Sequence, residues 1–150
     1  MRLVPLIAAV AALSVVAAGA ANADPATPNF NLEVILRPVA DGSGFGLVKF
    51  RQPKDADKII YLDTWVRDLA HDHTYSLERA VDTAVNDRCD GTNWLPLGTI
   101  GTDADGSGRA ALSRSVATIP LGTEFDIHFR VVGATGVVLE SGCYQYVVSQ

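Results

Sequence analysis

Residues 95–133 read LPLGTIGTDADGSGRAALSRSVATIPLGTEFDIHFRVVG, and this stretch decides the fold. Its centre, residues 103–108, is rich in Gly, Asp and Ser, which favour tight turns because they accept positive φ or hydrogen-bond their own backbone. Its last part alternates polar residues with the apolar residues Phe125, Ile127, Phe129 and Val131. This period of two predicts a half-buried strand. The stretch therefore predicts a meander of strand, turn, strand, corner and strand, around which one antiparallel β-domain is built.

The rest of the chain repeats this alternation in segments that turn-forming residues separate. The further strands are predicted at 30–37, 45–51, 59–67 and 74–82, with one bulged or two short strands at 137–140 and 143–149. A helix over 76–85 is the alternative for one segment, but its strand-like neighbours favour a strand. Seven to nine short strands at regular spacing predict an all-β, antiparallel, immunoglobulin-like or Greek-key β-sandwich.

The N-terminus has the pattern of an export signal. Met1-Arg2 precedes an apolar run, and Ala21-Asn22-Ala23 offers a cleavage site of small residues. The alternative is an uncleaved membrane anchor, but no basic cluster follows the run. We expect a signal peptide at 1–23, a flexible leader at 24–29 and one domain at 30–150. The mature protein would be secreted or periplasmic, with no stable membrane insertion after signal cleavage.

Charge and cysteine content narrow the classes of partner and compartment. The chain has 17 acidic and 12 basic side chains, a net charge of −5. This balance argues against nucleic acid as a partner. The two cysteines, Cys89 and Cys143, predict one disulfide in an oxidising compartment. Two free thiols or a metal pair are the alternatives, although neither a CxxC spacing nor neighbouring ligands support them.

Two sequence patterns contain residue types that bind metal ions. Asp103, Asp105 and Ser107 resemble the start of a calcium loop, but position twelve of that loop would be the cation Arg114, which favours a hairpin turn. The three histidines are His71, His73 and His128. An HxH pair on an extended segment projects both rings to one side, and a third His could complete a site for one copper or zinc ion.

The string His71-Asp72-His73 is similar to part of the histidine-rich site of copper/zinc superoxide dismutases, which have a Greek-key β-barrel. That resemblance implies a metal-binding or redox protein that uses His71, His73 and His128, with Asp72 or Asp126 nearby. Three histidines cannot build the two-metal site of that family. The other interpretation is a polar turn with an outward-facing His128.

The mature region resembles small exported bacterial β-sandwich proteins of uncharacterised role. The resemblance is carried by LGTIxTDADGxG from Leu97, by LxxxxxYxL over 69–77 and by the cysteine pair. It implies no catalytic residues, and no GxSxG elbow or dinucleotide fingerprint is present. Four aromatic residues are candidates for a carbohydrate or peptide surface, although such residues more often belong to the core: Trp65, Trp94, Tyr144 and Tyr146.

The sequence thus favours a non-catalytic binding or structural module of the cell envelope without a cofactor. Its partner would be an envelope protein or a glycan, met through the loop over 83–94 or through an exposed strand edge. The alternative is the metal-binding or redox protein described above.

Overall fold

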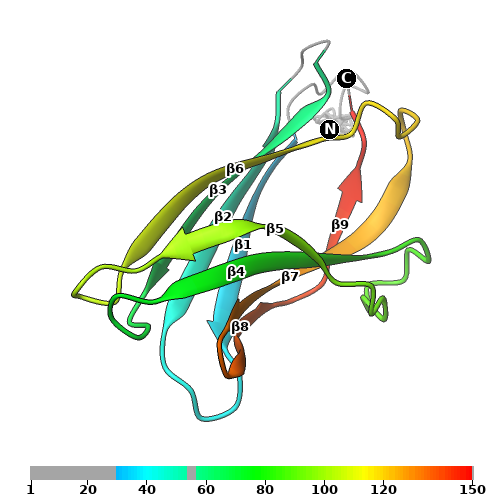
Figure 1. Ribbon diagram of the computed structural model, residues 1–150. Coiled ribbons are helices and arrows are strands. Elements are labelled where there is room, and N and C mark those ends of the chain that lie inside the picture. The colour runs from blue at the N-terminus through cyan, green and yellow to red at the C-terminus, as the bar shows by residue number, and fades with distance from the viewer. Residues whose placement is uncertain (1–29, 54–56, 150) are drawn as a thin grey trace, which may run out of the picture.

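The computed structural model describes residues 30–53 and 57–149, and within these residues it contains nine strands and no helix (Figure 1). The strands are β1 (Phe30–Pro38), β2 (Phe45–Gln52), β3 (Ile59–Arg67), β4 (Thr74–Asp82), β5 (Leu95–Gly101), β6 (Gly108–Ser115), β7 (Glu124–Gly133), β8 (Gly136–Ser141) and β9 (Tyr144–Val147). The predicted signal peptide and leader lie outside the described residues. Among the described residues, no helix is long and apolar enough to cross a membrane.

The strands form one sheet in the order β5-β4-β7-β8-β1-β2-β3-β6, and β9 pairs with β7. All pairs are antiparallel. The sheet bends so that β4, β5 and β7 cross in front of β1 and β2 in Figure 1. Its two end strands, β5 and β6, meet again at the turn that joins them, which makes the sheet nearly closed. The predicted antiparallel all-β class is confirmed.

The predicted meander is wrong in its pairing. The strands of residues 95–133 form, but β5 pairs with β4, β6 with β3, and β7 with β4, β8 and β9. A single bridge between Thr102 and Gly108 joins β5 to β6 before the two strands diverge. The reason is that β3 offers β6, and β4 offers β5 and β7, a longer ladder than these three strands form with one another.

The core lies between the two halves of the bent sheet. Apolar residues on the inward face of each strand are buried, as the alternation predicts, and in β3 these are Ile60, Leu62 and Val66. Phe50 of β2 packs edge-on against Phe129 of β7, with ring centroids 6.2 Å apart. Tyr146 of β9 lies 4.9 Å from the ring of Phe50. These contacts tie the halves together across the interior.

The turn between β5 and β6 is docked on the turn between β3 and β4. The hydroxyl of Thr102 donates to the carbonyl of Ala70 at 2.7 Å and accepts the amide of His73 at 3.0 Å. The amide of Leu69 donates to the carbonyl of Gly106 at 3.1 Å. These bonds fix the β5–β6 turn on the β3–β4 turn, and the bridge between Thr102 and Gly108 holds β5 and β6 together there.

A buried polar cluster gives a pH-dependent prediction. The Tyr146 hydroxyl donates to Gln52, and burial raises the pKa of this phenol above its ordinary value of about 10. Above pH 10 the unfolded chain releases this proton while the folded chain keeps it. The free energy of unfolding should therefore fall with rising pH by up to about 1.4 kcal/mol per unit. Urea unfolding between pH 8 and 11 measures this slope.

Tyr146→Phe is the matched control, because it removes the hydroxyl and keeps the ring. The stability difference between wild type and variant should be constant below pH 10 and should shift in favour of the variant above it. Parallel curves over the whole range would contradict the prediction.

Candidate functional site

The divergence of β5 and β6 opens the interior of the sheet. We call the gap between these two strands the seam. Midway along the two strands they still lie close, because a Cβ on Gly98 of β5 would come within 2.5 Å of the Leu112 side chain of β6. Further along the strands, a side chain takes the place of backbone hydrogen bonds between β5 and β6. The guanidinium of Arg114 of β6 donates to the carbonyls of Pro96 at 2.7 Å and Leu97 at 3.2 Å. The seam is thus bridged by one guanidinium where a backbone ladder would otherwise run.

A cavity of about 300 Å³ lies behind this bridge, and we call it the seam cavity. Aromatic and aliphatic side chains from β2, β3 and β7 line its inner part, among them Phe50, Leu62 and Phe129. The connection between β6 and β7 supplies Ile119 and Thr123. Protein interiors are normally packed to crystal density, so a void of this size in a small domain is a feature that needs an explanation.

Two guanidinium groups line the seam cavity, those of Arg79 and Arg114. Arg79 follows Tyr75 and Leu77 on the inward face of β4, where alternation would place another apolar residue. Burial, and next the positive charge of Arg114, lower the pKa of Arg79. Among the described residues no Asp or Glu lines the cavity, and neither guanidinium is in an ion pair. The seam cavity therefore combines an apolar interior with uncompensated positive charge.

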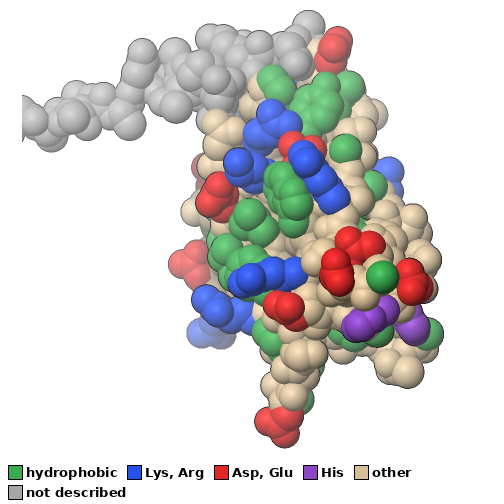
Figure 2. Space-filling model, turned by 90° about the vertical axis from the view of Figure 1, so that its left-hand side faces the viewer, with side chains coloured by type: hydrophobic (Ala, Val, Ile, Leu, Met, Phe, Trp, Pro, Cys, Tyr) green, Lys and Arg blue, Asp and Glu red, His purple; other side chains and the backbone are tan. Residues whose placement is uncertain are grey.

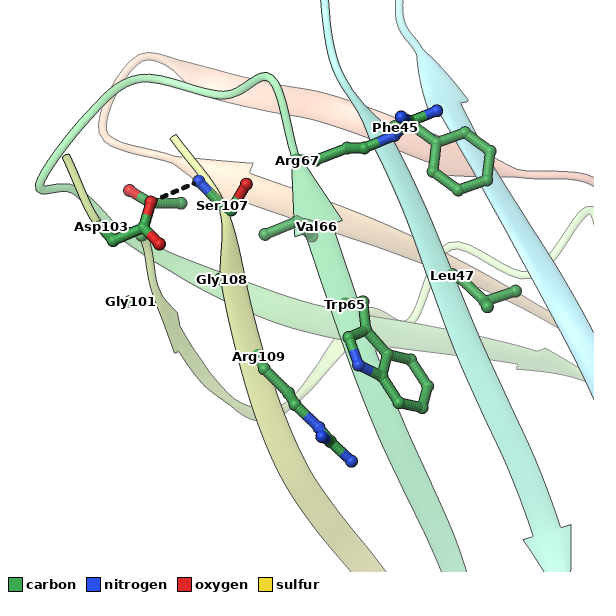
Figure 3. A pocket seen from close by; sticks show the side chains of 11 residues that line it. Phe45, Leu47, Trp65, Val66, Arg67, Gly101, Asp103, Ser107, Gly108 and Arg109 are labelled. Atoms are coloured by element: carbon green, nitrogen blue, oxygen red, sulfur yellow. Dashed lines mark hydrogen bonds between the residues drawn. The ribbon is translucent and has the colours of Figure 1, made fainter. Parts of the chain in front are cut away.

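A second depression of about 750 Å³ lies on the outer face of β2, β3 and β6 (Figure 3). Here arginines lie on aromatic rings, Arg109 at 4.8 Å from the centroid of Trp65 and Arg67 at 5.1 Å from that of Phe45. Figure 2 shows Lys and Arg beside hydrophobic side chains on the side of the molecule where β6 lies. The guanidinium groups occupy the ring faces on which a sugar would stack, so this surface is a weaker candidate.

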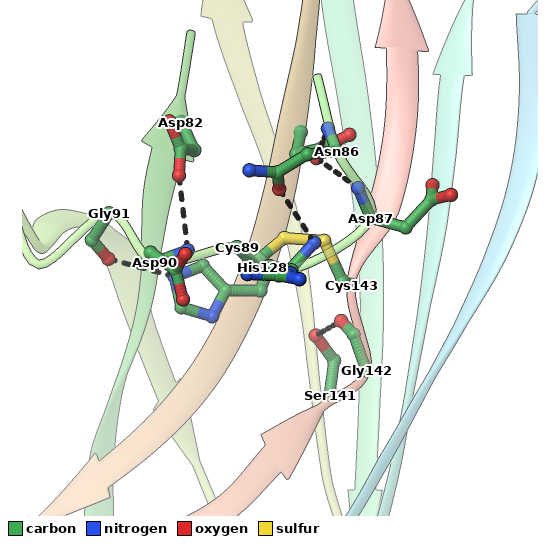
Figure 4. The surroundings of a disulfide bond; sticks show 12 residues. Asp82, Asn86, Asp87, Cys89, Asp90, Gly91, His128, Ser141, Gly142 and Cys143 are labelled. Carbon is green, nitrogen blue, oxygen red and sulfur yellow. Dashed lines mark hydrogen bonds between the residues drawn. A yellow bond between two sulfur atoms is a disulfide. The ribbon is translucent and has the colours of Figure 1, made fainter. Parts of the chain in front are cut away.

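The cysteine pair forms the predicted disulfide, which links the loop after β4 to the segment between β8 and β9 (Figure 4). A buried carboxylate, Asp126 of β7, holds the same loop by accepting the amides of Asn86 at 2.9 Å and Asp87 at 2.8 Å. The other oxygen of Asp126 is buried without a partner among the described residues. The loop over 83–94 is thus anchored by a covalent bond and by a carboxylate.

The structure does not bring the three histidines together. His71 and His73 are exposed in the turn after β3, where the ring of His73 contacts the carbonyl of His71. His128 lies on β7, its ring stacked on Trp94 at 4.3 Å and its Nε2 atom 3.1 Å from the carbonyl of Gly91. No group of three His, Cys, Asp or Glu residues within the described part of the chain could hold a metal ion. The copper or zinc site stays a prediction of the sequence that the geometry does not favour.

The aspartate-rich segment is the predicted turn. One carboxylate oxygen of Asp103 accepts the amides of Asp105 at 3.0 Å and Ser107 at 2.9 Å, so it closes the turn on itself. The residue that departs from the calcium pattern, Arg114, is the one that bridges the seam.

The four aromatic candidates lie in different places. Tyr146 is fully buried, and the Tyr144 hydroxyl accepts the amide of Ile35 at 3.2 Å. Trp94 is covered by the guanidinium of Arg130, 4.1 Å from its ring, and Trp65 lies under Arg109 in the outer depression. They do not form one carbohydrate or peptide surface.

The comparisons with known proteins give no further guide to the site. No protein-family model matches this chain, and neither a curated protein nor a solved structure shows significant similarity to it.

The seam cavity was not predicted from the sequence, but one signal for it is visible there. In 74–82 the residues Tyr75, Leu77 and Val81 share a face, and the cation Arg79 interrupts that face. An arginine on the inward side of a strand needs either a buried acid or a polar opening beside it.

Proposed function

We propose that the protein is an exported, non-catalytic binding module of the cell envelope, and that the seam cavity holds its ligand. Export is supported by the predicted signal peptide at 1–23 and by the Cys89–Cys143 disulfide, since disulfides persist in oxidising compartments. The sequence offers no catalytic set, and the described residues that line the seam cavity include no pair of groups arranged for acid–base or nucleophilic work. Binding is therefore the role that the site supports.

We further propose that the bent sheet is an immunoglobulin-like or Greek-key sandwich. Two observations support this finer assignment. The halves β5-β4-β7-β8 and β1-β2-β3-β6 are joined by a ladder of only three residue pairs between β1 and β8. The edge-on contact of Phe50 with Phe129 packs the halves face to face.

The observation that carries the functional proposal is the apolar void behind the seam. Sites for small molecules are concave, mostly apolar cavities with a few polar groups, and they begin at about 300 Å³. The seam cavity has this size, an apolar lining and two arginines as its principal polar groups. An envelope protein or a glycan bound at the loop over 83–94 is the other proposal for a partner.

Binding of a neutral apolar probe tests this proposal. We expect N-phenylnaphthylamine to bind the purified protein saturably at one site, with increased fluorescence, because the aromatic interior removes the probe from water. Decanol should displace it. The variant Ile119→Trp, which fills the cavity, should weaken probe binding by about tenfold or more, as expected for the loss of about 1.4 kcal/mol.

The matched control is Val85→Trp, which adds the same ring at an exposed position outside the cavity. It should bind the probe like wild type. Unchanged unfolding midpoints show that both variants are folded. No saturable binding to wild type, or equal binding to both variants, would contradict the proposal.

A further inference from the structure

The two arginines of the seam cavity differ in what they contact. The guanidinium of Arg114 donates hydrogen bonds to the carbonyls of Pro96 and Leu97, and this bridge across the seam explains why Arg114 lies there. The guanidinium of Arg79 has no hydrogen bond and no ion pair among the described residues, although this side chain is only partly exposed. A guanidinium has five donors in a planar fork, and burying part of it without an acceptor costs free energy. This arrangement is explained if the acceptor is not part of the chain.

The like charges reinforce this point. Burial is the larger cause of the lowered pKa of Arg79, and the positive charge of Arg114 lowers it further, which means that each guanidinium makes the charged form of the other less favourable in the free protein. An anion beside Arg79 would relieve that repulsion, and a carboxylate matches the guanidinium fork with two parallel hydrogen bonds. No acidic side chain lines the cavity within the described residues. The position is therefore complementary to a negative charge that comes from outside.

The shape of the cavity decides what the anion is attached to. Behind the arginines the lining turns apolar, with Phe125, Ile127 and Phe129 of β7 facing Ile60 and Leu62 of β3. An inorganic anion would leave this space empty, and a neutral hydrocarbon would leave Arg79 without an acceptor. A single-chain molecule with an anionic end satisfies both parts at once.

We propose that the ligand of the seam cavity is a single-chain carboxylate amphiphile of the fatty-acid type. Its carboxylate is bound by Arg79 beside Arg114, and its acyl chain lies on the apolar lining between β3 and β7. This inference rests on the proposed function, because it names the class of ligand for the same cavity. The carboxylate would also neutralise one of the two positive charges that the guanidinium groups place at the seam.

Three ten-carbon probes that differ only in the head group test the inference by calorimetric titration at pH 7.5: decanoate, decanol and decylamine. We expect decanoate to bind wild type about 10–100-fold more tightly than decanol, the range that corresponds to a hydrogen bond with a charged partner. Decylamine, a cation at this pH, should bind more weakly than decanol. Raising the NaCl concentration should weaken the binding of decanoate and leave that of decanol unchanged.

Arg79→Gln should weaken decanoate binding by about 10–100-fold and change decanol binding by less than about twofold. Arg79→Lys keeps the charge but loses the planar fork, so it should recover only part of the affinity. The matched control is Arg88→Gln, which removes an exposed arginine from the loop over 83–94, outside the cavity. It should bind all three probes like wild type.

Failure of this inference is distinguishable from failure of the proposed function. If decanol and N-phenylnaphthylamine bind and decanoate has no advantage over decanol, the cavity binds ligands but the anionic class is wrong. If decylamine binds as tightly as decanoate, the class is also wrong. If none of the probes binds to wild type, both proposals fail. The salt dependence uses wild type alone, so the test holds even if an Arg79 variant does not fold.

Discussion

The double variant Cys89→Ser, Cys143→Ser is expected to lose about 4 kcal/mol of the free energy of unfolding. The disulfide closes a loop with a sequence separation of 54 residues, and without it the unfolded chain regains the entropy of that loop. The loss is large compared with the 5–15 kcal/mol that typically stabilises a domain. Replacing both cysteines avoids a free thiol that could form bonds between molecules. Urea unfolding of wild type and variant at pH 7 measures the difference.

Reduced wild type is the control for the double variant, because it keeps both side chains and lacks only the covalent bond. Both forms should show the same loss within about 1 kcal/mol, since Asp126 continues to hold the loop through the amides of Asn86 and Asp87. A double variant as stable as oxidised wild type would show that the link does not restrict the unfolded chain.

Gly106→Ala is expected to destabilise the protein by about 2–5 kcal/mol, the second large effect. Gly106 has φ of +73°, and a Cβ there would lie 2.2 Å from the carbonyl oxygen of Leu69. The left-handed conformation costs an L residue about 1–2 kcal/mol, and overpacking adds about 1–3 kcal/mol. Because this oxygen belongs to the backbone, the contact cannot be relieved by a side-chain rotation. The unfolding midpoint in urea measures the loss.

Two other glycines separate the cost of the left-handed conformation from the cost of the close contact. Gly122 has φ of +76° with nothing within 4 Å of an added Cβ, so Gly122→Ala should show the conformational cost alone, about 1–2 kcal/mol. Gly101 lacks both the positive φ and the near neighbours, and Gly101→Ala should be close to neutral. If all three variants lose the same stability, the contact between the turns is not what makes Gly106 necessary.

The strands could be predicted from the sequence because each one carries its own signal. In 59–67 and 74–82 the alternation gives the bounds that β3 and β4 have, and in 125–131 it gives the inward face of β7. The possible helix over 76–85 is a strand up to Asp82 because both edges of β4 find partners, β5 and β7. The alternation of apolar and polar residues indicates which side chains of a strand are buried, and it can be recognised within that segment alone.

The pairing of the strands could not be predicted, because alternation does not say which strand lies beside which. The meander followed from the assumption that neighbours in sequence pair. The structure instead sends β5 and β6 to opposite ends of the sheet. The seam cavity depends on that separation and is lined by residues from β2 to β7, so it could not be predicted from single segments of the sequence.

The candidate site residues show the same limit, because the sequence does not say which distant residues meet in space. Cys89 and Cys143 could be paired by counting, because two cysteines allow one intramolecular disulfide. The histidines could not be placed by counting, because whether His128 meets His71 depends on the path of β7. The sequence shows that Arg114 occupies the position at which a calcium loop needs a carboxylate. Its contact with the carbonyls of β5 could not be predicted, because it depends on the fold.

The bridge made by Arg114 also bears on self-association. A strand edge with free amides and carbonyls is a template for pairing with a second copy, and β-sheet proteins block such edges. At the seam, β5 carries Pro96, which has no amide to donate, and the carbonyls of Pro96 and Leu97 are already occupied by Arg114. An incoming strand would find no amide donor at Pro96, and it would find the carbonyls of Pro96 and Leu97 already hydrogen-bonded. The opening between β5 and β6, through which we propose that a small molecule enters, is thus poorly suited to pairing with the backbone of another chain at this point.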